Sequence, residues 1–199
     1  MTKLALFGGQ KVITHEFKKY NPLGIEEVEA AKAVIESGVL SQYIGAWHDD
    51  FLGGPKVKEF EQAVCDYFDV KYAITVNSWT SGLVAAIGAI GIEPGDEVIV
   101  TPWTMSASAT AILHWNAIPV FADIDPLTYN LCPKSIEQNI TPYTKAIMVA
   151  DIFGLSADID PIMQIAEKHG LKVISDTAQA PSAIYKNRWA GTCLSLIHI

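Results

Sequence analysis

The most constraining feature of the sequence is a regular alternation, between residues 72 and 175, of short apolar runs with segments of helical periodicity. Apolar runs of this length suit buried strands, and the helical segments between them supply the crossovers that parallel strands need. The expected strands are residues 72–76, 97–101, 118–122, 146–150 and 172–175. The expected helices of this region are residues 81–90, 106–115, 134–139 and 161–168. The pattern predicts an α/β fold with a mostly parallel sheet covered on both faces.

Outside this region the sequence predicts two further helices and one long loop. Apolar residues at helical spacing predict a helix over residues 25–35 and a second over 57–68. Residues 38–55 form a glycine-punctuated, aromatic-rich loop, for which a role at the substrate and a packed surface role are equally good interpretations. Asp160, followed by Pro161 at the first helical position, is predicted to cap the last helix.

Composition excludes several classes of function. The net charge is −8 and the lysines are scattered, so a nucleic-acid groove is not expected. The three cysteines form no CxxC pair, which is typical of a reducing compartment. No signal peptide or membrane-spanning run is evident, so we expect a cytoplasmic protein. The sequence also lacks a dinucleotide-binding GxGxxG, a P-loop, a nucleophile elbow and the histidine spacings of a metal site.

Polar and aromatic residues follow the predicted strands, where ligands bind in α/β sheets. Asp176 follows the strand at 172–175, and it suits either a helix cap or a carboxylate aimed at a ligand. Residues 78–82 open a helix, and they suit either ordinary capping or a phosphate site. Trp103 and Met105 offer either a group that lies on a ring or core packing. Asp151 and the other strand-end carboxylates are interpreted as turn and cap residues.

A phosphate site, a stacking residue and a strand-end carboxylate around one sheet edge together describe a pyridoxal phosphate pocket. An aspartate at the pyridine nitrogen keeps that nitrogen protonated, so that the ring can accept electrons.

Four segments resemble the DegT/DnrJ/EryC1/StrS aminotransferases, which are fold-type I pyridoxal phosphate enzymes acting on keto sugars and keto cyclitols. The segments are VNSWTSGLVAA (76–86), EPGDEVIVTPWTMSASATAIL (93–113), PVFADID (119–125) and ISDTAQAPSA (174–183). The resemblance implies an N-terminal segment, residues 1–30, followed by part of the cofactor-binding large domain, residues 31–199. It covers about residues 8–192.

The resemblance also implies roles for single residues. Thr80 and Ser81 match the positions that hold the cofactor phosphate, and Asp176 matches the carboxylate at the pyridine nitrogen. Gln179 matches the residue that contacts the ring hydroxyl. Met105 stands where the family stacks an aromatic side chain, and Trp103 is the expected substitute.

One departure concerns the lysine that forms the Schiff base. In the family, the AGT motif leads through a serine to this lysine, whereas here Ala190-Gly191-Thr192 is followed by CLSLIHI and no lysine follows Lys186. Lys186 lies before the motif and does not match the catalytic position, and Ser195 is too close to Thr192 to be the family's serine. We therefore expect a truncated and inactive first half of an aminotransferase, without the small domain.

The resemblance implies transamination of a keto sugar, often nucleotide-linked, or of a keto cyclitol, with an amino acid as donor and a homodimer as the parent enzyme. Two alternatives are a non-catalytic ligand-binding or interaction module and another fold-type I enzyme, such as an aldolase or a desulfurase. A third is a lysine-less sugar dehydratase, in which a histidine replaces the lysine and for which His198 is the candidate.

Overall fold

The structure is a computed structural model that describes residues 3–40 and 42–193. The chain divides into two units, residues 1–58 and 59–199, and each is described by itself. The boundary falls within α2 (Pro55–Phe68). None of the helices in the described residues combines the length and the apolar character needed to span a bilayer.

The first unit contains a short 3₁₀ helix, η1 (Ala5–Phe7), and α1 (Ile25–Ser37). The backbone N–H of Gly24 donates to Glu27 Oε2 at 2.7 Å, which fixes the start of α1. The helix ends at Gly38, whose φ of 70° is the left-handed conformation common after a helix. The helix predicted at residues 25–35 is thereby confirmed, with two additional residues.

The second unit is built on a four-stranded parallel sheet in the order β2-β1-β3-β4. The strands are β1 (Glu97–Val100), β2 (Ile118–Phe121), β3 (Thr144–Ala150) and β4 (Lys172–Asp176). The bounds of each strand agree with those of a predicted strand to within two residues. The predicted α/β class is confirmed.

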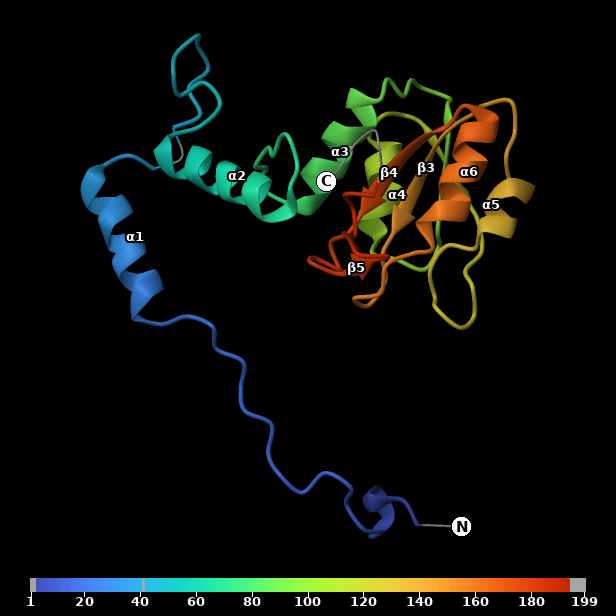
Figure 1. Ribbon diagram of the computed structural model, residues 1–199, viewed down its shortest axis with the longest axis horizontal. Helices are drawn as coiled ribbons and strands as arrows, with labels where there is room; N and C mark the ends of the chain where they lie inside the picture. The colour runs from blue at the N-terminus through green and yellow to red at the C-terminus, as the bar shows by residue number, and fades with distance from the viewer. Residues whose placement is uncertain (1–2, 41, 194–199) are drawn as a thin grey trace. The chain divides into compact units, whose positions relative to one another are not determined.

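Helices cover both faces of this sheet (Figure 1). The four helices are α3 (Trp79–Ala89), α4 (Ser106–Leu113), α5 (Pro133–Gln138) and α6 (Ile159–His169). Ile174 of β4 packs with α3 and α4 on one face, whereas Val173 packs with α5 and α6 on the other. This alternation follows from the two-residue repeat of a strand. Both side chains are almost fully buried, and such burial stabilises by about 1.5–3 kcal/mol per residue.

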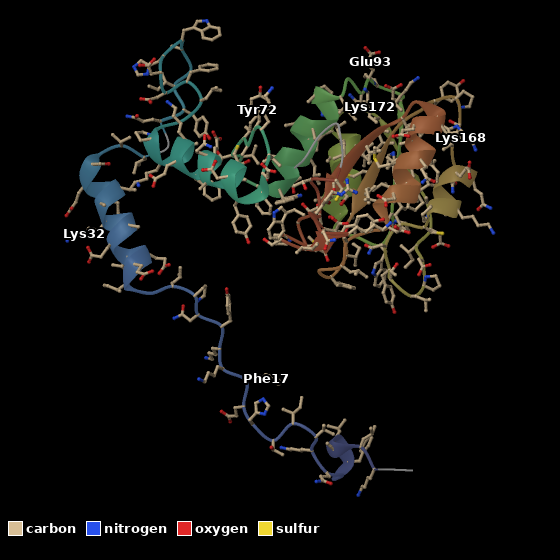
Figure 2. All side chains as sticks on the ribbon, in the orientation of Figure 1. Phe17, Lys32, Tyr72, Glu93, Lys168 and Lys172 are labelled. Carbon is tan, nitrogen blue, oxygen red and sulfur yellow. The ribbon has the colours of Figure 1, made fainter. Side chains whose placement is uncertain are left out.

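Exposed ion pairs join elements on the α6 side. Lys168 of α6, labelled in Figure 2, pairs with Glu137 of α5. At the other end of α6, Asp160 pairs with Lys186 at 2.6 Å and with Arg188 at 3.4 Å. Lys186 and Arg188 belong to a two-stranded hairpin of β5 (Ile184–Tyr185) and β6 (Arg188–Trp189), and we call these contacts the hairpin tether.

The N-cap predicted at Asp160 is wrong. Helix α6 begins at Ile159, so Asp160 lies in its first turn. Its carboxylate pairs with the hairpin instead of capping the helix, because two cations are within reach.

The strand predicted at residues 72–76 is also wrong. This segment has no regular secondary structure, and the parallel sheet of the described residues contains β1 to β4 only. Tyr72 and Ile74 are largely exposed, although their residue types favour strands. A strand needs a hydrogen-bonded neighbour, and an apolar run cannot supply one by itself.

Gly88 provides a test of the packing between α3 and the end of α4. A Cβ atom on Gly88 would lie 2.1 Å from Cζ2 of Trp115. The indole is held in place because its Nε1–H donates to the carbonyl of Val84 at 2.7 Å. We expect Gly88→Ala to lower the free energy of unfolding by about 1–3 kcal/mol, because overpacking outweighs a helix-propensity gain of about 1 kcal/mol.

Urea denaturation followed by circular dichroism measures this effect. The control is the same substitution in a Trp115→Ala background, where the obstructing ring is absent and Gly88→Ala should be neutral or stabilising. Equal destabilisation in both backgrounds would contradict this account of the packing.

Candidate active site

Buried polar residues gather where the parallel strands end. Thr101 follows β1, Asp151 follows β3, and Asp176 is the last residue of β4. All three are buried, and the backbone N–H of Asp151 donates to the carbonyl of Asp176 at 3.0 Å. Because the strands are parallel, their carboxyl ends lie along one edge of the sheet, which is where α/β proteins bind ligands.

The carboxylate of Asp176 is held on both oxygens. Ser108 Oγ donates to Oδ2 at 2.7 Å, and the backbone N–H of Ala178 donates to Oδ1 at 3.3 Å. Asp176 is 6% exposed, so it keeps a small opening to solvent. A carboxylate held in this way has a fixed orientation at the sheet edge, as a partner for a ring nitrogen requires.

Ser108 was not among the site residues predicted from the sequence; it comes from α4 and is fully buried. Its spacing from two apolar residues of the same helix could have indicated that it is buried. Ser108 precedes Ala111 and Ile112 by three and four residues, so it lies on the same helical face as these two buried apolar residues. A serine on such a face needs a hydrogen-bond partner, and here that partner is Asp176.

Thr80 and Ser81 lie half-buried in the first turn of α3. Ser78 caps this helix, since its Oγ accepts the N–H of Ser81 at 3.2 Å. The hydroxyls of Ser78 and Ser81 are also 3.0 Å apart. Ordinary capping is therefore present at Ser78. The Thr80 and Ser81 hydroxyls lie at a helix N-terminus, whose positive end suits a phosphate.

The remaining predicted residues lie around the same strand ends. Gln179 follows β4, and its Oε1 accepts the backbone N–H of Phe153 at 3.3 Å. Trp103 follows β1 and packs at a tilt on Tyr129, with ring centroids 6.0 Å apart. Met105 precedes α4 and is 66% exposed. Neither Trp103 nor Met105 is core filler, but their predicted role at the cofactor ring stays a prediction.

A cavity of about 460 Å³ connects the start of α3 with the segment after β4. Its lining includes Trp79, which precedes Thr80, Thr177, which follows Asp176, and Thr192 of the AGT motif. Gly191 borders it with a φ of 82°, and a Cβ atom there would lie 3.0 Å from Thr177 Cγ2. Glycine is therefore required where the AGT turn meets the residue after Asp176.

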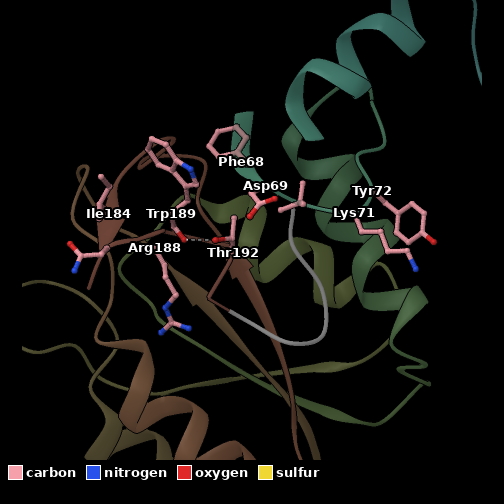
Figure 3. Close-up of a pocket in the computed structure, with 10 residues that line it drawn as sticks. Phe68, Asp69, Lys71, Tyr72, Ile184, Arg188, Trp189 and Thr192 are labelled. Atoms are coloured by element: carbon pink, nitrogen blue, oxygen red, sulfur yellow. Dashed lines mark hydrogen bonds between the residues drawn. The ribbon is translucent and has the colours of Figure 1, made fainter. Parts of the chain in front are cut away.

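A larger cavity, of about 860 Å³, lies farther from the strand ends (Figure 3), and none of the predicted site residues lines either cavity. The larger cavity lies between residues 68–72 and the hairpin, and Thr192 Oγ1 at its wall donates to the carbonyl of Trp189 at 2.9 Å. Trp189 stacks on Tyr67 at 5.3 Å. We place the candidate site at the strand ends because the buried, oriented carboxylate is there.

Asp151 is 3% exposed and anchors the loop that follows β3. Its Oδ1 accepts the N–H of Ala157 at 2.7 Å, whereas Oδ2 has no hydrogen-bond partner among residues 3–40 and 42–193. Burial raises the pKa of Asp151 to about 6, and the negative charge of Asp176 adds to this rise. The Ala157 N–H and the Ser156 hydroxyl act in the opposite direction.

The surroundings of Lys186 do not suit a nucleophile. Its ammonium group pairs with Asp160 in the hairpin tether, and this hydrogen bond raises the pKa of Lys186. An amine held in the protonated form cannot attack a carbonyl. The hypotheses for Ser195 and His198, and for a lysine beyond the AGT motif, concern positions outside the described residues.

An α/β sheet with an oriented aspartate at its carboxyl edge and hydroxyls at a neighbouring helix N-terminus is the layout of a fold-type I pyridoxal phosphate enzyme. Residues 31–196 match the DegT/DnrJ/EryC1/StrS aminotransferase family. The chain belongs to this family, as the sequence predicted.

Named relatives and a solved structure agree with this assignment. The chain is 45% identical over 139 residues to GDP-perosamine synthase of Caulobacter vibrioides, a match that covers 70% of this chain and 38% of the relative. It is 43% identical over 141 residues to UDP-2-acetamido-2-deoxy-3-oxo-D-glucuronate aminotransferase of Pseudomonas aeruginosa, covering 71% of this chain and 39% of the relative. NtdA of Bacillus subtilis, solved with the cofactor PMP bound, is 29% identical with a TM-score of 0.74, covering 89% of this chain and 41% of NtdA. The predicted fold-type I architecture is confirmed.

The chain spans about two fifths of the length of these relatives.

Proposed function

We propose that this chain forms the cofactor-binding part of an aminotransferase that moves an amino group from an amino acid to a keto sugar or keto cyclitol. The observation that carries the proposal is the carboxylate of Asp176, which is buried at the end of β4 and held on both oxygens. Pyridoxal phosphate is the cofactor of the family, so the cofactor predicted from the sequence is confirmed.

The residues at the strand ends fit this cofactor. Thr80 and Ser81 at the start of α3 would hold its phosphate, because hydroxyls and a positive helix end suit a dianion. Asp176 would hold the proton on the pyridine nitrogen, and Gln179 would lie at the ring hydroxyl. Trp103 or Met105 would cover the ring face. When bound, the cofactor supplies an electron sink for the bond-breaking step at the amino-group carbon.

The proposed substrate class is a keto sugar linked to a nucleotide, because the relatives named for such sugars are 45% and 43% identical to this chain, whereas a relative named for an inosose, a keto cyclitol, is 37% identical. A keto cyclitol stays the second possibility, and a panel of both separates them. The amino-acid donor, the homodimer, the large-domain boundary at residue 31 and the cytoplasmic location stay predictions. No contact of the described residues favours the non-catalytic module, the aldolase or desulfurase, or the dehydratase.

Cofactor binding tests the proposal without requiring turnover. We expect pyridoxamine phosphate, titrated into the protein and followed by tryptophan fluorescence, to bind saturably. Ser81→Ala should weaken binding about tenfold, because it removes a hydroxyl from a charged phosphate. Ser106→Ala is the matched control, since Ser106 is an exposed serine in the first turn of α4.

Absence of saturable binding by the unaltered protein would contradict the proposed function. The gene sequence beyond codon 192 supplies an independent test. An in-frame continuation with a lysine shortly downstream supports the transaminase, and a stop codon there favours the non-catalytic module.

A further inference from the structure

Three side chains form a chain of hydrogen bonds that leads from the start of α4 to the end of β4. Thr104 Oγ1 lies 3.1 Å from Ser108 Oγ, and Ser108 Oγ lies 2.7 Å from Asp176 Oδ2. Ser108 is fully buried and Thr104 is half-buried. The contact joins residues 68 positions apart in the sequence, so it depends on the folded unit.

The direction of each bond follows from the number of protons available. A carboxylate oxygen only accepts, so Ser108 must donate its single hydroxyl proton to Asp176. Ser108 Oγ is then left as an acceptor toward Thr104, and Thr104 must be the donor. Both hydrogen bonds therefore donate in the direction of the Asp176 carboxylate.

This arrangement fixes the plane of the Asp176 carboxylate. Ser108 holds Oδ2 and the N–H of Ala178 holds Oδ1, so rotation about the Cβ–Cγ bond would break both hydrogen bonds. Asp151 follows β3, and its backbone N–H donates to the carbonyl of Asp176 at 3.0 Å. The side chain of Asp151 belongs to the opposite face of the sheet, because its strand neighbour Ala150 is the residue in register with Asp176.

We propose that Ser108 is a positioning residue, aligned by Thr104, which holds the Asp176 carboxylate in the orientation that binds the protonated ring nitrogen of the cofactor. The inference rests on the proposed function and extends it to a residue outside the cofactor contacts predicted from the sequence. Without Ser108 the same negative charge would be present, but it would no longer be held in one orientation. Alignment at such sites contributes because a carboxylate and a ring N–H interact best when they are coplanar.

The test uses pyridoxamine phosphate labelled with ¹⁵N in the ring, bound to the protein. The ¹⁵N chemical shift reports whether the ring nitrogen is protonated, which a purely structural role of Ser108 would not change. We expect Ser108→Ala to lower the proton affinity of this nitrogen about tenfold, or about one pKa unit. Thr104→Val should give a smaller change in the same direction, whereas Thr104→Ser, which keeps the hydroxyl, should match the unaltered protein.

Ser106→Ala is the matched control on the same helix and should leave the ¹⁵N shift unchanged. A circular dichroism melt of each variant shows whether it is folded, and a folded Ser108→Ala protein with an unchanged ¹⁵N titration would overturn the inference alone. If Ser108→Ala does not fold, the Thr104→Val and Thr104→Ser pair decides, and equal titrations for these two would overturn the inference. Absence of binding by the unaltered protein would contradict the proposed function and this inference together.

Discussion

Replacing Asp176 with asparagine is expected to lower aminotransferase turnover by about 10²- to 10³-fold, the loss typical when one group that stabilises transition-state charge is removed. Asparagine cannot carry the negative charge that keeps the ring nitrogen protonated, so the cofactor becomes a weaker electron sink. The substitution leaves the fold in place, because an asparagine oxygen can still accept the hydrogen bond from Ser108. Steady-state kinetics on the longest in-frame chain that the gene encodes measures the effect.

Asp123→Asn is the matched control for this prediction. Asp123 follows β2, so it is also a carboxylate beyond a strand of the same sheet, but it is exposed and its Oδ1 accepts the N–H of its neighbour Ile124 at 2.9 Å. We expect its turnover to equal that of the unaltered enzyme. An Asp176→Asn enzyme that binds the cofactor and retains full turnover would refute the role of Asp176.

Replacing Asp151 with asparagine is expected to change the free energy of unfolding more favourably above pH 7 than at pH 4. Burial raises the pKa of Asp151 to about 6 in the folded state, from the ordinary value of 3.8. The folded state therefore binds this proton more tightly than the unfolded state. The resulting stabilisation is fully present below pH 3.8 and is lost as the pH rises through about 6.

A difference of about two pKa units corresponds to about 3 kcal/mol, which is an upper bound because the site can relax. Asparagine does not titrate, so the difference in unfolding free energy between Asp151→Asn and the unaltered protein should rise by up to this amount between pH 4 and pH 8. Its side-chain oxygen can still accept the N–H of Ala157. Urea denaturation at a series of pH values measures the change.

Asp160→Asn provides the contrast. The pKa of Asp160 is lowered by its hydrogen bond with Lys186, so this exposed carboxylate stays ionised from pH 5 to pH 8. The change in unfolding free energy caused by Asp160→Asn should therefore be constant from pH 5 to pH 8. Parallel curves for Asp151→Asn and the unaltered protein between pH 4 and pH 8 would contradict the raised pKa of Asp151.

The four strands of the parallel sheet and the helices that cover it could be predicted because each depends on a local pattern, whereas the hairpin of β5 and β6 was not predicted. The apolar run before Asp176 and the helical spacing of residues 106–113 are both visible in the sequence, and both elements are present. Residues 72–76 are an exception. Their composition favours a strand, but a strand also requires a neighbour, which is a property of the fold and not of the segment.

The candidate site could be predicted in part for a similar reason. Asp176 stands at the end of an apolar run, so its position at the sheet edge follows from its place in the chain. Ser108 was missed because its partner is distant in sequence, and only the fold brings the two together. The contact between Gln179 and the backbone of Phe153 likewise depends on how two loops meet.

The hairpin tether has a consequence for the stretch of chain that carries the AGT motif. Gly191 packs against Thr177 beside the candidate site, and it follows a hairpin fastened to α6 by Asp160, Lys186 and Arg188. Those contacts are exposed charges, so dissolved ions screen and weaken them, whereas the apolar layers around the sheet contain no charges to screen. The ion pairs beside the AGT motif and the apolar layers around the sheet therefore rest on two different forces, and charge screening by salt weakens only the first.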